Sequence, residues 1–158
     1  MKFKNFVKML GGEGTIYEAP NGDKWLGGIV GTFTMMKIPS FNTGIIAKNI
    51  KPMNFDLAQA VVAEPDCECT LTSARLEHPD DKAGEILRCF GCPMGAVEIK
   101  NKQFGLIERF NTTGIYCIDE EDGINILQIL KRSGEDQEVE GIMFDYTFMR
   151  QEDESLWQ

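Results

Sequence analysis

Apolar residues near the start of the chain recur with helical spacing. They occur at i, i+3, i+4 and i+7, which places four of them on one face of a helix: Phe3, Phe6, Val7 and Leu10. The glycine pair at 11–12 is a natural end for this helix. A second helix is predicted after Asn54, a good N-cap residue, and Pro65 requires it to end near Glu64. We expect the first helix to bury its apolar face on a sheet.

Most of the remaining apolar residues lie in short runs separated by turn residues, as in strands joined by hairpins. Asn21-Gly22 supplies the positive φ angles of a tight turn between two such runs. From Cys67 onward the residues alternate with a period of two, which places Cys67, Cys69 and Leu71 on the inner face of a strand. The predicted strands cover residues 15–18, 24–26, 31–38, 44–50, 67–72, 85–90, 96–100, 114–118, 124–130 and 141–149. Residues 103–110 fit a helical turn or a strand.

The order of these elements predicts an α+β fold with a mainly antiparallel sheet of short, hairpin-connected strands and two or three short helices. Strands outnumber helices, and the sequence shows no strand–helix–strand repeat. A chain of 158 residues has the size of one ordinary domain. We expect one α+β domain over residues 1–149, followed by an acidic tail over residues 150–158.

The charge of the chain limits the classes of partner. It carries 25 acidic and 16 basic residues, a formal net charge of −9. Because nucleic-acid binding depends largely on Lys and Arg that displace counterions from phosphates, we expect no nucleic-acid partner. No apolar run approaches the roughly 20 residues that cross a bilayer, and Lys4 and Lys8 interrupt the apolar segment of any signal peptide. We expect no membrane partner and a cytoplasmic location, or host cytoplasm or a virion if a phage encodes the protein.

Four of the five cysteines form two close pairs, Cys67-Glu68-Cys69 and Cys89-Phe90-Gly91-Cys92. The second pair resembles half of a zinc knuckle, so Cys67, Cys69, Cys89 and Cys92 are candidate ligands of a structural zinc ion. A regular Cys-x-Cys strand does not bring its thiolates together, however, and a free cysteine packs like a small hydrophobe. A reducing compartment also disfavours disulfides. We therefore expect buried free thiols and no cofactor, with zinc as the alternative.

His78 is the only histidine in the chain and lies in a polar segment between Glu77 and Pro79. Together with one of the cysteines it could form a cysteine–histidine pair for nucleophilic catalysis. Like Cys117, it could also replace one of the zinc ligands. A single histidine in a charged turn is more often only solvated. A cysteine-dependent enzyme is therefore the second alternative.

The last nine residues combine acidic and apolar side chains. Glu152, Asp153 and Glu154 cannot be buried cheaply, so we expect this segment to leave the domain surface. Leu156 and Trp157 follow them, and tryptophan is enriched both in cores and at interfaces. Trp157 either folds back onto its own domain or docks, with the acidic residues, into a basic, apolar-lined groove of a partner.

Taken together, these features predict a non-enzymatic protein-binding or assembly module whose partner is another protein or further copies of the chain. A compact acidic α+β chain of this size is similar in general character to the small accessory or virion-associated proteins of phages and mobile elements. A zinc-stabilised module and a cysteine-dependent enzyme remain the alternatives.

Overall fold

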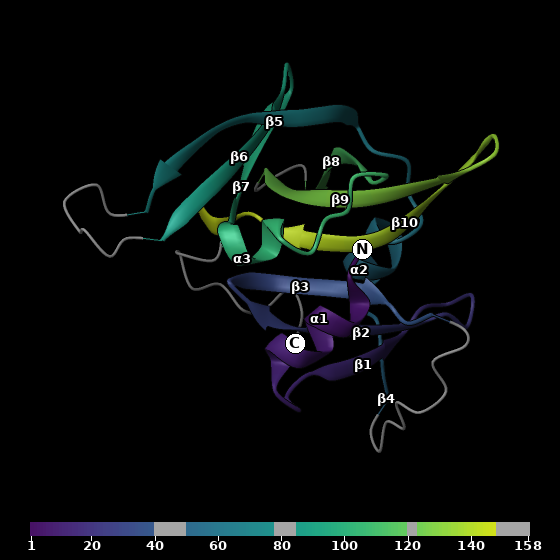
Figure 1. Cartoon of the computed structure of the whole chain (residues 1–158). Coiled ribbons are helices and arrows are strands. Elements are labelled where there is room, and N and C mark those ends of the chain that lie inside the picture. Colours follow the sequence, from purple (N-terminus) through teal and green to yellow (C-terminus); the bar gives the residue numbers. More distant parts are fainter. Residues whose placement is uncertain (40–49, 78–84, 120–122, 148–158) are drawn as a thin grey trace.

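The computed structural model describes residues 1–39, 50–77, 85–119 and 123–147. These residues contain three helices and ten strands (Figure 1). The helices are α1 (Phe3–Leu10), α2 (Phe55–Ala60) and α3 (Asn101–Phe104). The strands are β1 (Thr15–Glu18), β2 (Lys24–Val30), β3 (Thr32–Lys37), β4 (Ile50–Pro52), β5 (Cys67–Leu76), β6 (Ile86–Cys92), β7 (Gly95–Lys100), β8 (Thr112–Asp119), β9 (Ile124–Ser133) and β10 (Asp136–Phe144).

The ten strands form one sheet with the order β4-β1-β2-β3-β10-β9-β8-β5-β6-β7. Six of the neighbouring pairs join consecutive antiparallel strands. The other three join strands that are not consecutive: β3 with β10, β5 with β8, and β1 with β4, the last in parallel. The structure agrees with the predicted α+β class, but the sheet is mixed, and long-range pairs set its order as much as hairpins do.

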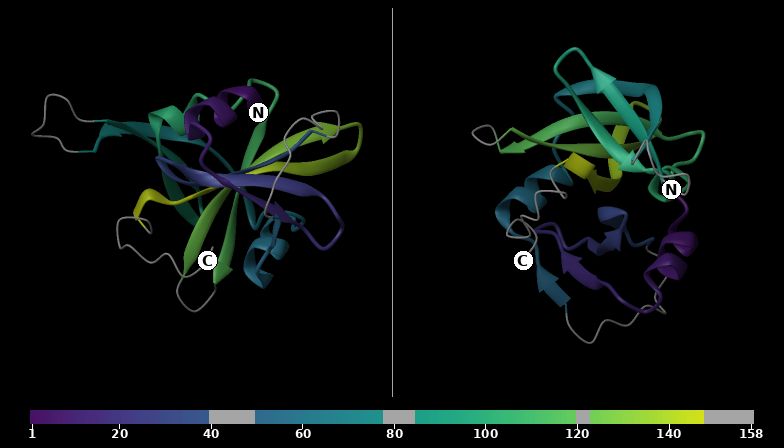
Figure 2. Two further views of the ribbon diagram at one scale, coloured as in Figure 1. Left: turned by 90° about the horizontal axis from the view of Figure 1, so that it is seen from below. Right: turned by 90° about the vertical axis from the view of Figure 1, so that its left-hand side faces the viewer.

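The central strands are buried on both faces of the sheet. Met35 and Met36 of β3, which point to opposite faces, are 0% and 1% exposed, and Ile142 and Met143 of β10 are both fully buried. Each face covers its own apolar cluster, and Leu57, Ala60 and Val61 place α2 and its C-terminal turn on the first one. Residues of α1, β6 and β7 belong to the second cluster. β7 contacts β8, β9 and β10, so the β5–β7 end of the sheet folds back over its centre (Figures 1 and 2).

Helix α1 confirms the predicted apolar face. Phe3 and Phe6 are 7% and 0% exposed in the second cluster, and Val7 and Leu10 pack against it while partly exposed. Gly11 ends the helix in the left-handed conformation, with a φ of 59°. The amphipathic pattern therefore identified both the helix and the side that it buries.

Helix α3 overlaps the start of the segment 103–110, which fits a helical turn or a strand by its sequence, and a buried polar side chain holds the helix in place. The amide nitrogen of Gln103, which is fully buried, donates to the hydroxyls of Thr32 and Thr34 at 2.6 and 2.9 Å. The amide oxygen of Gln103 accepts from the backbone N–H of Lys100 at 2.9 Å. Thr32 in turn donates to the Phe144 carbonyl at 2.7 Å. This network connects α3 to β3 and β10.

Three predictions about these elements differ from the structure. Helix α2 ends at Ala60 rather than near Glu64. Leu71 is 41% exposed rather than buried, because all residues of β5 from 70 to 76 are exposed; a bulge follows it, between Leu71 and Ser73. Strand β10 begins earlier and ends earlier than the predicted 141–149, because its polar start pairs with β9 beyond the core. The predicted strand over 44–50 lies outside the described residues except for its last residue.

Candidate functional site

The structure places the paired cysteines in two different states. Cys67 of β5 and Cys92 of β6 form a disulfide, with 6.7 Å between their Cα atoms. They meet because β5 and β6 are antiparallel neighbours that pair from Thr70 and Gly91 onward. The expectation of free thiols is therefore wrong for Cys67 and Cys92. Cys69 is a buried thiol, as expected, and Cys89 is a half-buried thiol.

These positions do not assemble the candidate zinc ligands while the disulfide is present, because two of the four sulfurs are bonded to each other. Burial raises the pKa of the Cys69 thiol, which opposes the thiolate form that binds zinc. Within the four described ranges, His, Cys, Asp and Glu side chains do not gather in threes or more as metal ligands. His78 lies outside those ranges. A zinc site and a cysteine–histidine pair therefore stay predictions.

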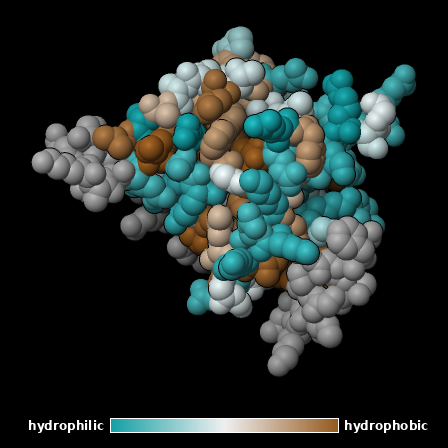
Figure 3. Space-filling model, viewed as in Figure 1, coloured by the Kyte–Doolittle hydropathy of each residue, from teal (hydrophilic) through white to brown (hydrophobic). Residues whose placement is uncertain are grey.

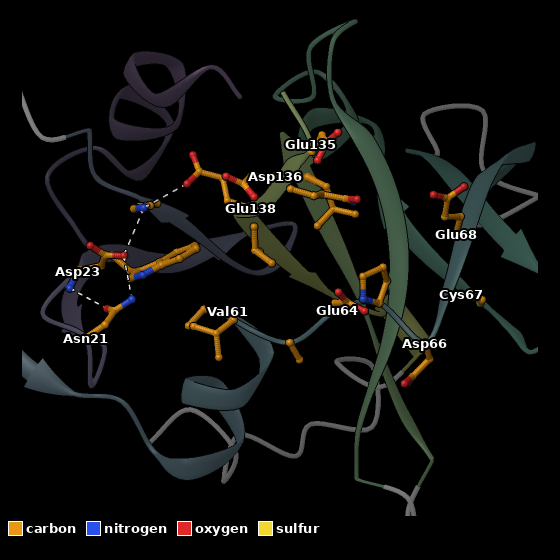
Figure 4. Close-up of a pocket in the computed structure, with 18 residues that line it drawn as sticks. Asn21, Asp23, Val61, Glu64, Asp66, Cys67, Glu68, Glu135, Asp136 and Glu138 are labelled. Atoms are coloured by element: carbon orange, nitrogen blue, oxygen red, sulfur yellow. Dashed lines mark hydrogen bonds and ion pairs between the residues drawn. The ribbon is translucent and has the colours of Figure 1, made fainter. Parts of the chain in front are cut away.

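The candidate site is a groove of about 830 Å³ that the sequence analysis did not find (Figure 4). Most of its lining comes from three parts of the chain, and Trp25, Lys37 and Leu130 complete it. The turn between β1 and β2 contributes Asn21 and Asp23, and the stretch from the end of α2 to the start of β5 contributes residues 61–68. The tip of the β9–β10 hairpin contributes residues 135–139. The groove therefore depends on the long-range pairing of the sheet.

Apolar side chains of the first cluster lie beneath the groove. Trp25, Val61, Leu130 and Val139 line it and are at most 6% exposed. The indole N–H of Trp25 is buried and has no acceptor among the described residues. Val62 also lines the groove and is 60% exposed. An apolar ligand group would cover Val62, and a ligand oxygen that reached the indole would satisfy its N–H.

The rim of the groove is acidic. Seven of the described lining residues carry carboxylates and one, Lys37, carries a positive charge; the acidic residues are Asp23, Glu64, Asp66, Glu68, Glu135, Asp136 and Glu138. The ammonium group of Lys37 lies 3.3 Å from Asp23 and 3.7 Å from Glu138, so it is shared by two of them. Figure 4 shows Glu135 and Asp136 on the hairpin and Glu64, Asp66 and Glu68 on the facing stretch of chain. The rim therefore favours a cationic ligand.

Two hydrogen-bonding side chains hold the wall that carries Glu64. Asn54 caps the start of α2 by accepting from the backbone N–H of Leu57 at 2.8 Å. At the other end, the buried amide of Gln128 donates to the carbonyls of Ala60 and Ala63 at 2.9 and 3.0 Å. These bonds satisfy carbonyls that the end of a helix leaves without partners. They also fix where the chain leaves α2 and enters the groove wall.

The next residues of this wall pack directly on β8. The Asp66 carboxylate accepts from the backbone N–H of Cys117 at 2.8 Å. A Cβ atom on Gly114 would lie only 2.4 Å from the Cβ of Pro65, so the close approach requires glycine at position 114. The wall is thus held at several points along β8 and β9, as a preformed binding site requires.

The residues predicted to contact a partner lie elsewhere. Glu152, Asp153, Glu154, Leu156 and Trp157 are outside the described residues, so the docking-peptide hypothesis stays a prediction. The described helices include none that is long and apolar enough to cross a membrane.

Sequence reasoning missed the groove because its parts are distant in the chain. The acidic residues from Glu135 to Glu140, and those that flank Pro65, are visible as a signal in the sequence. They could have indicated the rim, but only the pairing of β3 with β10 shows that the two acidic segments lie near Trp25. Comparison with protein-family models, curated proteins and solved structures found no match to this chain. The interpretation of the site therefore rests on its geometry and charge.

Proposed function

We propose that the protein is a non-enzymatic binding module that receives a basic, partly apolar segment of a protein partner in the acidic groove. The observation that carries the proposal is the combination of an apolar floor with a rim of seven carboxylates and one lysine among the described lining residues. A groove with this composition can bury apolar side chains of a ligand while its rim pairs with Lys or Arg.

The same charges argue against other ligand classes. Phosphates and carboxylates would meet like charge at the rim, and Lys37 is already shared between Asp23 and Glu138. A basic segment would instead relieve the repulsion among the rim carboxylates when it binds. Exposed ion pairs contribute little to affinity individually, so the apolar contacts with Val62 and the floor are expected to supply the rest.

The proposal can be tested with two dye-labelled synthetic peptides of equal length, one alternating Lys and Val and one alternating Glu and Val. Fluorescence anisotropy should detect binding of the basic peptide and no binding of the acidic one. The affinity should fall as salt is added, because contacts at an exposed rim are screened. The double variant Glu64→Gln/Glu135→Gln removes one charge from each side of the groove and should weaken binding about tenfold.

The control is Glu13→Gln/Glu18→Gln, which removes two exposed carboxylates that do not line the groove, one of which, Glu18, pairs with Lys24. It should change the affinity less than twofold, by the weak long-range effect of exposed charges. An equal loss in both double variants would show that net charge, and not the groove, attracts the peptide. Binding of the acidic peptide would also refute the proposal. An accessory or virion-associated role in a phage or mobile element stays a prediction from the sequence.

A further inference from the structure

Strand β5 leaves one of its edges open. It pairs with β8 only from Cys67 to Cys69, and with β6 from Thr70 to Leu76. On the side away from β6, residues 70–76 have no strand partner within the described chain. All seven of these residues are exposed, although strands that lie against a core usually alternate between buried and exposed positions. The ribbon formed by β5 and β6 projects from the body of the molecule (Figure 2).

The hydrogen-bond pattern shows which backbone groups face this open edge. The N–H of Glu77, just after β5, donates to the carbonyl of Glu85 at 2.8 Å and therefore points toward β6. Successive residues of a strand direct their N–H and C=O groups to opposite sides. The backbone groups of Leu76 and Ala74 consequently point away from β6, into the open edge.

The chain protects its other edges. At β7, the Asp145 carboxylate accepts from the N–H of Glu98 at 3.0 Å, and Gln103 accepts from the N–H of Lys100 at 2.9 Å. At the opposite end of the sheet, β4 has three residues and includes Pro52. Short strands, proline and covered backbone groups are ordinary protections against unwanted strand pairing.

The open edge of β5 is less protected. A bulge lies between Leu71 and Ser73, and the Arg75 guanidinium donates to the Leu76 carbonyl at 3.4 Å, but the edge contains no proline and no covering side chain at Ala74 among the described residues. Arg75 is its only charged residue, and the Arg75 guanidinium already binds the Glu98 carboxylate through two contacts of 2.6 and 3.0 Å. The edge is thus nearly neutral on a chain with a net charge of −9. Leu71, Leu76 and Ile86 add exposed apolar surface to the ribbon, with 41%, 42% and 38% exposure. Figure 3 shows apolar side chains at this end of the molecule.

We propose that β5 is a self-association site, at which the β5 strands of two copies pair antiparallel across a two-fold axis at Ala74. This register places the outward-facing groups of Ala74 opposite each other, Arg75 opposite Ser73 of the second copy, and Leu76 opposite Thr72. It brings no like charges together, whereas an axis at Arg75 would oppose the two arginines. The occupant is a second copy because the edge is complementary to itself in this register.

The size of the contact determines the strength expected of the dimer. In this register the five residues 72–76 of each copy face one another and, with few apolar side chains, form a contact below the standard size of stable interfaces. The dimer should therefore be in reversible equilibrium with the monomer. Its sheet would continue from one copy into the other through β5.

Sedimentation equilibrium over a range of concentrations should show this monomer–dimer equilibrium in the full chain. Ala74→Pro removes an outward-facing N–H without removing a bond to β6, so it should abolish the dimer and leave the melting temperature nearly unchanged. Ala74→Lys places two positive charges opposite each other and should weaken the dimer at least tenfold. A nonreducing gel would detect copies joined by disulfides.

The matched control is Ala96→Lys, which adds the same charge at an exposed alanine of β7. This variant should dimerise like the unmodified protein. The proposal fails if the protein is monomeric at about 1 mM, where even interfaces with millimolar Kd are populated. It also fails if Ala74→Lys and Ala96→Lys dimerise equally. Peptide binding in the groove should survive in the monomeric Ala74→Pro variant, so the two proposals can fail separately.

Discussion

The disulfide between Cys67 and Cys92 should account for a large part of the stability of this chain. The bond joins the start of β5 to the end of β6 and closes a loop with a sequence separation of 25 residues. For a loop of that size, the loss of chain entropy in the unfolded state predicts about 3.5 kcal/mol of stabilisation. Reduction, or the double variant Cys67→Ala/Cys92→Ala, should lower the free energy of unfolding in urea by about that amount.

Two measurements make this expectation specific. Alkylation of the unfolded, unreduced protein should modify the three unbonded cysteines, Cys69, Cys89 and Cys117, and spare the other two. Cys89→Ala, which changes a half-buried thiol of the same ribbon, should keep the sensitivity to reduction. If all five cysteines are alkylated without reduction, the bond does not form. If the bond forms but its reduction costs less than about 0.5 kcal/mol, the loop-entropy argument is refuted.

Three further predictions concern other parts of the molecule. In a urea titration, Gln103→Ala should lower the free energy of unfolding by about 2–4 kcal/mol, because it leaves buried groups of Lys100, Thr32 and Thr34 without their partner. The control Gln59→Ala, at an exposed position, should lower it by less than about 0.5 kcal/mol. Burial raises the pKa of the Asp145 carboxyl, so the folded state binds the carboxyl proton more tightly than the unfolded state. The free energy of unfolding, compared with that of Asp145→Asn, should therefore fall as the pH rises from the ordinary aspartate pKa of 3.8 to the raised pKa of the folded state, and a difference that grows with pH would contradict this. Deletion of residues 150–158 should shift the melting temperature by no more than about two degrees and abolish a contact found by pull-down, and a loss of several kcal/mol would instead identify Trp157 as a core residue.

Local patterns predicted local structure well. The spacing of Phe3 and Phe6 located α1 and its buried face, and Asn21-Gly22 located the turn between β1 and β2. These predictions depend on interactions within about ten residues, where periodicity and turn chemistry are informative. The Met35-Met36 pair carried a weaker signal, because two adjacent apolar residues next to Thr34 and Lys37 are too short a run to show that a strand is buried on both faces.

Features that depend on distant residues could not be predicted in the same way. The disulfide requires the β5–β6 register to bring Cys67 near Cys92. The exposure of Leu71 arises because residues 70–76 are all exposed, which alternation along the strand does not show. Reasoning from the compartment then favoured thiols over the bond that the structure contains. The groove likewise forms only when β10 pairs with β3. In the sequence alone, each of its acidic residues therefore resembles an ordinary solvent-exposed charge.

The central place of β10 has a consequence for how the protein folds as it is made. β10 lies between β3 and β9, and its partner Met36 is separated from Gly141 by more than half of the chain. Contacts of such high sequence separation slow folding, because a long loop must close before they form. In a nascent chain that lacks β10, β3 has no neighbour on its outer side, and Met35 and Met36 are unprotected. The emerging N-terminal half is therefore expected to depend on delayed collapse or on chaperones until residues 136–144 have left the ribosome.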